Sequence, residues 1–264
     1  MTICIAGISN NKQIVGITDK MLTLPKPVAT TYEITENNKI IKLTDKSFAL
    51  FAGDVIGANS ILSLAKKNIN EGQSVNEIAE LVKKAYKDYW TSIVNDNLFQ
   101  RYQLSLDSYM ENQKNIDQNL VQQINHILGQ HNVGVEIIIA GLDGETPFIY
   151  KILNPGTIIS YNSVGYCCIG SGMQHATLSL IESEYHSGLS VQESVFATFQ
   201  AKKKAEYDPG VGELCDVVLL NDNYKKLTTT QLSAIIRIYN DYHSDITQRK
   251  STCFSSIENE IINN

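Results

Sequence analysis

Short apolar runs separated by turn residues fill the first fifty positions and predict β-strands. Apolar residues within 3–17 flank the polar segment 9–12, a pattern that is typical of a β-hairpin. Two more strands are predicted at residues 39–43 and 48–51, on either side of a polar turn at 44–46. The chain is therefore expected to begin as antiparallel sheet.

Apolar residues then recur at steps of three and four, which indicates helices. We expect one helix over residues 54–70 and a second that opens at the capping box of residues 74–77. Residues 96–132 are rich in Asn and Gln and poor in glycine, and we interpret them as a polar, helical insertion. The remaining pattern predicts strands at 135–140, 148–152, 158–161, 166–169 and 217–220, and helices from about Gly172, over 190–204 and over 232–242.

The order of these elements predicts the fold class. Strands, two helices, strands, two helices and a strand fit two sheets packed face to face with a helix pair outside each, an α+β four-layer α/β/β/α sandwich. We expect a single domain over residues 1–264 that carries the insertion at about 96–132 and a C-terminal helical extension from about 228.

Composition narrows the classes of function. The 264 residues are 43% hydrophobic and carry a net charge of −6, which excludes wholesale disorder and disfavours a nucleic-acid partner. Apolar runs are too short to cross a bilayer, and the uncharged start does not resemble a secretory leader. Four of the five cysteines lie in apolar runs, as expected for free thiols of a cytoplasmic protein. No histidine has metal-ligand spacing, so neither a metal nor a cofactor is expected.

Thr2 is the most informative candidate for chemistry. Initiator methionine is generally removed before a small residue, and this would leave Thr2 with a hydroxyl nucleophile and an α-amine base whose ordinary pKa is about 7.7–8.0. Asp19 ends the second predicted strand and Lys39 begins the third, so adjacent strand ends can bring both side chains to Thr2. A lysine ammonium would lower the pKa of the hydroxyl, and a carboxylate would hold the lysine. The alternative is that Asp19 and Lys39 are solvated turn charges.

The chain also resembles the β-type proteasome subunits, N-terminal-nucleophile (Ntn) hydrolases of the same family as the bacterial protease rings. The residues that carry the resemblance begin with Thr2 and continue in order through segments 18–23, 39–43, 51–53, 138–143 and 168–172. The insertion at 96–132 and the tail past about residue 225 have no counterparts. The resemblance implies the four-layer sandwich and an N-terminal threonine peptidase.

The resemblance also implies a role for individual residues. Thr2 would be nucleophile and base, Lys39 would tune its hydroxyl, and Asp19 would orient Lys39. Gly53 would donate its backbone N–H to the oxyanion, and Ser171 would bind the amine region of Thr2. A late acidic residue that supports the site would be either Glu206 or Asp208.

The substrate-binding positions follow from the same resemblance. They are Leu22, Thr23, Asn37, Ile41, Phe51 and Val55. Their apolar character predicts a small or medium apolar side chain before the cleaved bond, although Ile41 and Val55 could equally be core residues. The lysine run 202–204, by contrast, is predicted to be a solvated helix end.

Three functions remain open at this point. The first is a threonine peptidase that cleaves peptide bonds through an acyl-enzyme ester. The second is a transpeptidase or peptide ligase like the connectases, in which a peptide amine resolves the ester and the polar insertion docks substrate. The third is a non-catalytic assembly subunit. The implied partners are peptides or unfolded proteins, further copies in a ring or stack, and an ATPase unfoldase.

Overall fold

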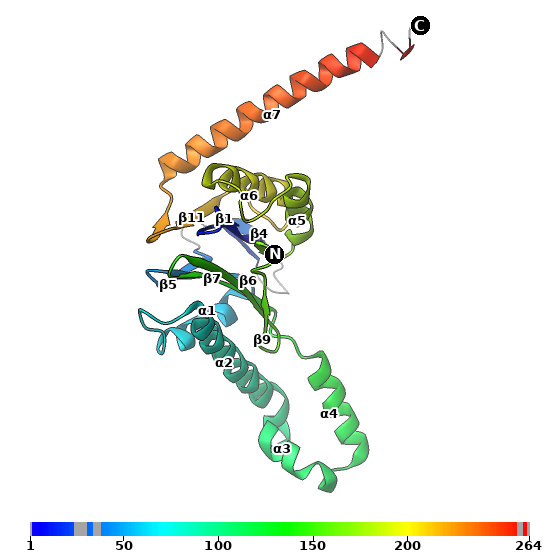
Figure 1. The fold of residues 1–264 in the computed structure, drawn as a ribbon. Coiled ribbons are helices and arrows are strands. Elements are labelled where there is room, and N and C mark those ends of the chain that lie inside the picture. The colour runs from blue at the N-terminus through cyan, green and yellow to red at the C-terminus, as the bar shows by residue number, and fades with distance from the viewer. Residues whose placement is uncertain (1, 24–30, 34–37, 258–260, 263–264) are drawn as a thin grey trace. The chain divides into compact units, whose positions relative to one another are not determined.

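The structure is a computed structural model in which residues 2–23, 31–33, 38–257 and 261–262 are described (Figure 1). The chain divides into two compact units, residues 1–225 and residues 226–264. Each unit is described by itself below.

One five-stranded sheet carries the start of the chain. Its order is β10-β1-β2-β11-β12, and β1 runs antiparallel to both β2 and β10. This places β1 between two strands that are about 150 residues apart in sequence. The bounds are β1 Cys4–Ser9, β2 Gln13–Asp19, β10 Tyr166–Ile169, β11 Cys215–Leu220 and β12 Tyr224–Lys226.

The second five-stranded sheet is a meander in chain order, β5 to β9. Its bounds are β5 Ile40–Thr44, β6 Ser47–Gly53, β7 Val135–Asp143, β8 Thr146–Leu153 and β9 Thr157–Ser160. A short hairpin of β3 (Met21–Thr23) and β4 (Thr31–Glu33) stands apart from both sheets.

The two sheets pack face to face with helices outside (Figure 1). Alternate residues of β1, Cys4, Ala6 and Ile8, contribute to a core shared with Phe48 and Ile138 of the second sheet, because successive side chains of a strand point to opposite faces. Helices α1 (Val55–Lys66) and α2 (Val75–Val94) cover the other face of the second sheet, and α5 (Met173–Glu182) and α6 (Val191–Ala205) cover the first. The predicted α+β four-layer sandwich is confirmed.

Helices also occupy the segment interpreted as an insertion, which leaves the end of α2 (Figure 1). It contains a π-helical turn, two 3₁₀ turns, α3 and α4. Five buried residues form a small separate core in and next to it: Val94, Phe99, Tyr109, Val121 and Ile124. The bounds are Asn95–Phe99, Gln100–Tyr102, α3 Leu106–Asn112, Gln113–Asn115 and α4 Gln118–Gln130.

The second unit consists mainly of α7 (Thr229–Ile257), a single long helix with no buried residue. Among the described residues no helix is both long and apolar enough to cross a membrane.

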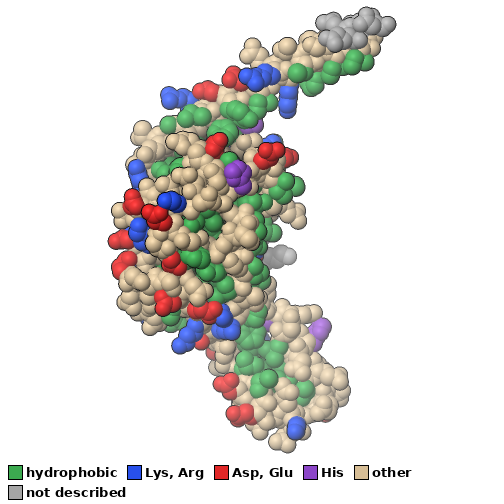
Figure 2. Space-filling view, viewed as in Figure 1, with side chains coloured by type: hydrophobic (Ala, Val, Ile, Leu, Met, Phe, Trp, Pro, Cys, Tyr) green, Lys and Arg blue, Asp and Glu red, His purple; other side chains and the backbone are tan. Residues whose placement is uncertain are grey.

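Acidic and basic side chains are interspersed on the face shown in Figure 2, so the acidic excess forms no single-sign patch there.

Two features differ from the sequence-based expectations. Strands β3, β4 and β12 were not predicted, because runs of three residues are too short to show an alternating pattern. The prediction that residues 202–204 form a solvated helix end is wrong for Lys202, which has no exposed surface. Its ammonium lies against Glu206 and 2.5 Å from the carbonyl oxygen of Glu213, so this side chain points into the protein.

Candidate active site

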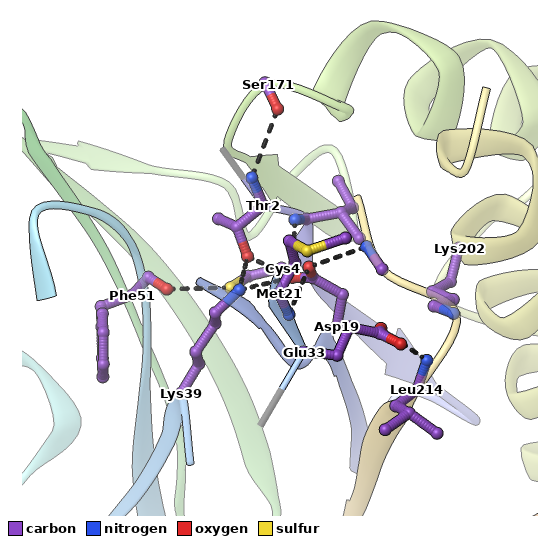
Figure 3. Close-up of polar contacts among 12 residues, drawn as sticks. Thr2, Cys4, Asp19, Met21, Glu33, Lys39, Phe51, Ser171, Lys202 and Leu214 are labelled. Atoms are coloured by element: carbon purple, nitrogen blue, oxygen red, sulfur yellow. Dashed lines mark hydrogen bonds and ion pairs between the residues drawn. The ribbon is translucent and has the colours of Figure 1, made fainter. Parts of the chain in front are cut away.

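Thr2, Asp19 and Lys39 meet where three strand ends lie together (Figure 3). The Lys39 ammonium donates to Thr2 Oγ1 and lies 2.7 Å from Asp19 Oδ1, and the Thr2 hydroxyl contacts the same carboxylate oxygen. Thr2 is 2% exposed, Asp19 0% and Lys39 2%. The alternative that Asp19 and Lys39 are solvated turn charges is therefore wrong.

Backbone N–H groups hold the Asp19 carboxylate. Ile3 N donates to Oδ1 at 3.0 Å, and Met21 N and Gly212 N donate to Oδ2 at 3.0 and 3.1 Å. A buried carboxylate requires such donors, because an unpaired charge would be costly away from water. Sequence reasoning missed Gly212, whose only signal is its place in the glycine-containing turn before β11.

Ser171 lies beside the backbone nitrogen of Thr2, and its hydroxyl oxygen is 3.3 Å from Thr2 N (Figure 3). The neighbouring glycines fit closely around the same residue. Gly172 N donates to the Thr2 carbonyl at 3.3 Å, and Gly170 has a φ of +99°. A Cβ at Gly170 would lie 2.3 Å from the Thr2 carbonyl oxygen, so only glycine allows this approach.

Gly53 ends β6 beside Thr2 and has a φ of +97°. A Cβ at this position would lie 1.8 Å from the carbonyl oxygen of Gly134, which accepts a hydrogen bond from Asp54 N at 2.9 Å. The Asp54 side chain accepts from the N–H groups of Ile56 and Gly57 and so caps α1. The strand-to-helix turn therefore exposes the backbone of Gly53 at the site.

Cys4 is a second nucleophilic group at the same place. Its thiol donates to the Phe51 carbonyl with a separation of 3.1 Å, and burial raises the pKa of Cys4 well above the ordinary value for a thiol. A thiol in that state is a poor nucleophile because the thiolate is the reactive form. The Thr2 hydroxyl, in contact with an ammonium, is the better candidate.

Two pockets meet at Thr2, and Ala52 and Gly53 line both. The smaller has a volume of about 10 Å³ and is lined also by Met21, Leu22, Lys39, Phe51 and Val55. The larger has a volume of about 450 Å³ and extends past Ser171.

The structure thus brings three of the predicted substrate-binding residues, Leu22, Phe51 and Val55, around one small pocket. Ile41 instead packs against the core beneath α1 and α2, as its alternative interpretation had it. Thr23 belongs to β3, but its side chain is not among those described, and Asn37 lies outside the described residues.

The late acidic residues have other partners. Glu206 contacts the ammonium groups of Lys202 and Lys203, and Asp208 Oδ1 accepts from Gly210 N at 2.7 Å. What this segment contributes to the Asp19 carboxylate is the N–H of Gly212.

Comparison with known proteins decides the family. The family described as Proteasome subunit matches residues 88–218, about half of the chain. The chain belongs to the proteasome subunit family. No curated protein matches the sequence at a significant level.

Membership in this family places the chain among peptidases in general and confirms the proteasome-like Ntn-hydrolase resemblance. Proteasome subunits generally assemble into oligomeric rings. The matched residues begin within α2 and end within β11, so they include Ser171 and exclude Thr2, Asp19, Lys39 and Gly53. The family match therefore does not extend to those four residues.

Proposed function

We propose that this proteasome-family protein is an N-terminal threonine peptidase, active after removal of Met1. The observation that carries the proposal is the direct contact of the Lys39 ammonium with Thr2 Oγ1. The same ammonium forms a buried ion pair with Asp19. A buried ammonium stabilises a developing alkoxide, since electrostatic interactions are stronger where water is excluded.

Acylation uses both functional groups of Thr2. Oγ1 forms a bond to the carbonyl carbon of the substrate while its proton passes to the free α-amine. When the tetrahedral intermediate collapses, the C–N bond breaks and the leaving nitrogen takes that proton. The product is an ester between Thr2 and the acyl part of the peptide. Ser171, 3.3 Å from Thr2 N, supports the position of the amine.

Gly53 is the proposed donor to the oxyanion. Phe51 N donates toward Lys39 O at 3.3 Å, on the β5 side of β6. Amides two residues apart in a strand point the same way, so the N–H of Gly53 also points to the β5 side of β6. Gly53 lies past the first residue of β5, so its N–H points toward the place where Thr2 and Lys39 lie. A preorganised donor of this kind typically contributes about 100-fold or more to the rate.

Hydrolysis of the ester restores the enzyme. Water attacks the ester carbon, its proton passes to the amine of Thr2, and Oγ1 leaves with that proton. The second candidate function is transfer to a peptide amine instead of water. The observation that favours transfer is the 450 Å³ pocket beside Ser171, which has room for a second peptide.

The proposal extends to partners. We infer that the protein forms a homo-oligomer, either a ring or a stack, because members of the family generally assemble into rings. Peptides or unfolded proteins are the substrates that the mechanism requires. An ATPase unfoldase and a cytoplasmic location stay predictions.

The direct test combines intact mass with a threonine-directed electrophile. We expect the purified protein to lack Met1 and to gain one inhibitor adduct on Thr2, and Thr2→Ala to gain none. Cys4→Ala is the matched control and should still be labelled. A demethionylated protein that is labelled on Cys4, or not at all, would contradict the mechanism. Mass spectrometry of peptide products separates cleavage from joining.

A further inference from the structure

Glu33 is an acidic residue close to the candidate site that lines neither of the two pockets at Thr2. It is the last residue of β4, and its backbone pairs with that of Met21 in β3. Its carboxylate reaches the segment before β11, where Oε1 accepts from Leu214 N at 2.9 Å (Figure 3). This contact joins the β3–β4 hairpin to a segment 181 residues further along the chain.

Both backbone groups of Leu214 are held by residues near the site. Its N–H donates to Glu33, and its carbonyl accepts from the N–H of Lys20, the residue after Asp19, at 3.1 Å. Two residues before Leu214, Gly212 N donates to Asp19 Oδ2 at 3.1 Å. The position of the Gly212 donor therefore depends on where Leu214 is held.

The Glu33 carboxylate also packs directly against Gly212. A Cβ at Gly212 would lie 1.8 Å from Glu33 Oε1 and 2.7 Å from Glu33 Cδ, which is too close for a real contact. The backbone of Gly212 does not have a positive φ, so space rather than conformation requires glycine here. A larger residue at position 212 would push the carboxylate away from Leu214 N.

Glu33 thus connects the two donors to one oxygen of Asp19. Met21 N, 3.0 Å from Oδ2, belongs to the strand that pairs with β4, and Gly212 N belongs to the segment that Glu33 holds. The other oxygen, Oδ1, lies 2.7 Å from the Lys39 ammonium. Because one carboxylate makes all these contacts, a shift of either donor would turn it and move the ammonium.

We propose that Glu33 is a positioning residue for the threonine reaction. Its carboxylate holds the segment of Gly212, and the Gly212 N–H in turn orients Asp19. Asp19 then holds the Lys39 ammonium against Thr2. This inference rests on the proposed threonine mechanism. A misplacement of about 1 Å can cost about 100-fold in rate, so a contact outside the pockets can still change kcat.

The role of Glu33 requires an acceptor oxygen and not a charge, because its partner is a backbone N–H. The side-chain amide of Gln offers the same acceptor. Glu33→Gln should therefore keep the contact with Leu214, whereas Glu33→Ala loses it. Gly212→Ala breaks the same contact from the other side, since the three atoms nearest to its new methyl group all belong to Glu33.

The test measures kcat and KM of these three variants with a peptidyl aminomethylcoumarin. We expect kcat to fall at least about 10-fold in Glu33→Ala and in Gly212→Ala. KM should stay within about 2-fold of wild type, because Glu33 lines neither pocket. Glu33→Gln should keep kcat within about 3-fold of wild type. Gly129→Ala, which adds a methyl group in open space on α4, is the matched control and should change neither constant.

The double variant decides whether Glu33 and Gly212 act through one contact. Glu33→Ala frees the space beside Gly212, so adding Gly212→Ala to it should lower kcat by less than a further 2-fold or about that. Losses that multiply in the double variant would overturn the inference. A Glu33→Gln protein as slow as Glu33→Ala would do the same.

Melting temperatures separate positioning from folding. Leu214 is 44% exposed, so water can replace the carboxylate at its N–H, and we expect the melting temperature of Glu33→Ala to stay within about 2 °C of wild type. A loss of kcat that follows a large fall in melting temperature would contradict a positioning role. Failure of the proposed function looks different, because the wild-type protein would then cleave no peptide and Thr2 would take up no electrophile.

Discussion

Asp19 shows at the scale of one residue how a site is made from backbone as well as side chains. Its two oxygens accept from three backbone N–H groups and face the Lys39 ammonium, so the buried charge is fully paired. Thr2, Asp19 and Lys39 could be proposed from the sequence because each stands at a predicted strand end. The donor Gly212 could not, since it lies 193 residues from Asp19 and in no regular element.

Asp19→Asn is the sharpest prediction at this scale. The amide keeps the size of the carboxylate but removes its charge, which leaves Lys39 buried at 2% exposure without a counter-ion. Breaking a buried pair in this way destabilises proteins by about 3–5 kcal/mol. We expect that loss in urea unfolding, together with a loss of peptidase activity of about 100-fold or more.

Asp45→Asn is the matched control. Asp45 pairs with Lys42 at the surface, where the side chains are 60% and 48% exposed, so its unfolding free energy should change by less than about 1 kcal/mol. An Asp19→Asn protein with wild-type activity would show that the carboxylate does not hold Lys39 for catalysis.

At the scale of elements, the last turn of α6 is attached through Lys202 to the segment that leads into β11. Lys202 has no exposed surface and contacts Glu206 one turn later, and it also donates to the carbonyl of Glu213 at the approach to β11. Three consecutive lysines at the end of a helix usually indicate that the end is exposed to solvent. No feature of the sequence indicates that the first of them is buried. Its burial follows from the way α6 packs on β1 and β2.

Glu206→Leu tests this attachment of α6 through Lys202. The substitution leaves the Lys202 ammonium buried with only a carbonyl partner, so we expect the unfolding free energy to fall by about 3 kcal/mol. Glu145→Leu removes the partner of Lys12 in a pair whose side chains are 79% and 60% exposed, and should leave the unfolding free energy almost unchanged because solvent screens such a pair. Equal changes in the two variants, measured by urea unfolding, would rule out a special role for Lys202.

At the scale of the whole molecule, the chain has a sandwich unit, in which a helical segment with its own small core lies between α2 and β7, and a separate C-terminal unit built on α7. The four layers could be predicted from sequence because the periods of two and of about 3.6 are local. The helical character of residues 96–132 could be predicted from their composition, yet the way in which the chain is fixed after α4 could not. That depends on Asn154, in the turn after β8, which meets residues 131–133 only in the fold.

Assembly is predicted at this scale. Because proteasome subunits generally form rings, the native mass from sedimentation equilibrium should be a multiple of the 29.4 kDa chain. The value should hold on dilution if the ring is stable. A single species at the mass of one chain would contradict the proposed homo-oligomer and would leave the active site open to folded proteins.

The sequence by itself determined the sandwich layers and the three strand-end residues Thr2, Asp19 and Lys39, because strand ends and periodicity are written in neighbouring positions. Only the tertiary structure decided the contact of Thr2 with Ser171, the Gly212 donor and the large pocket. These features join residues more than a hundred positions apart. Their distances depend on how the two sheets stack and on where the chain returns after α4, and no local pattern of side chains specifies that.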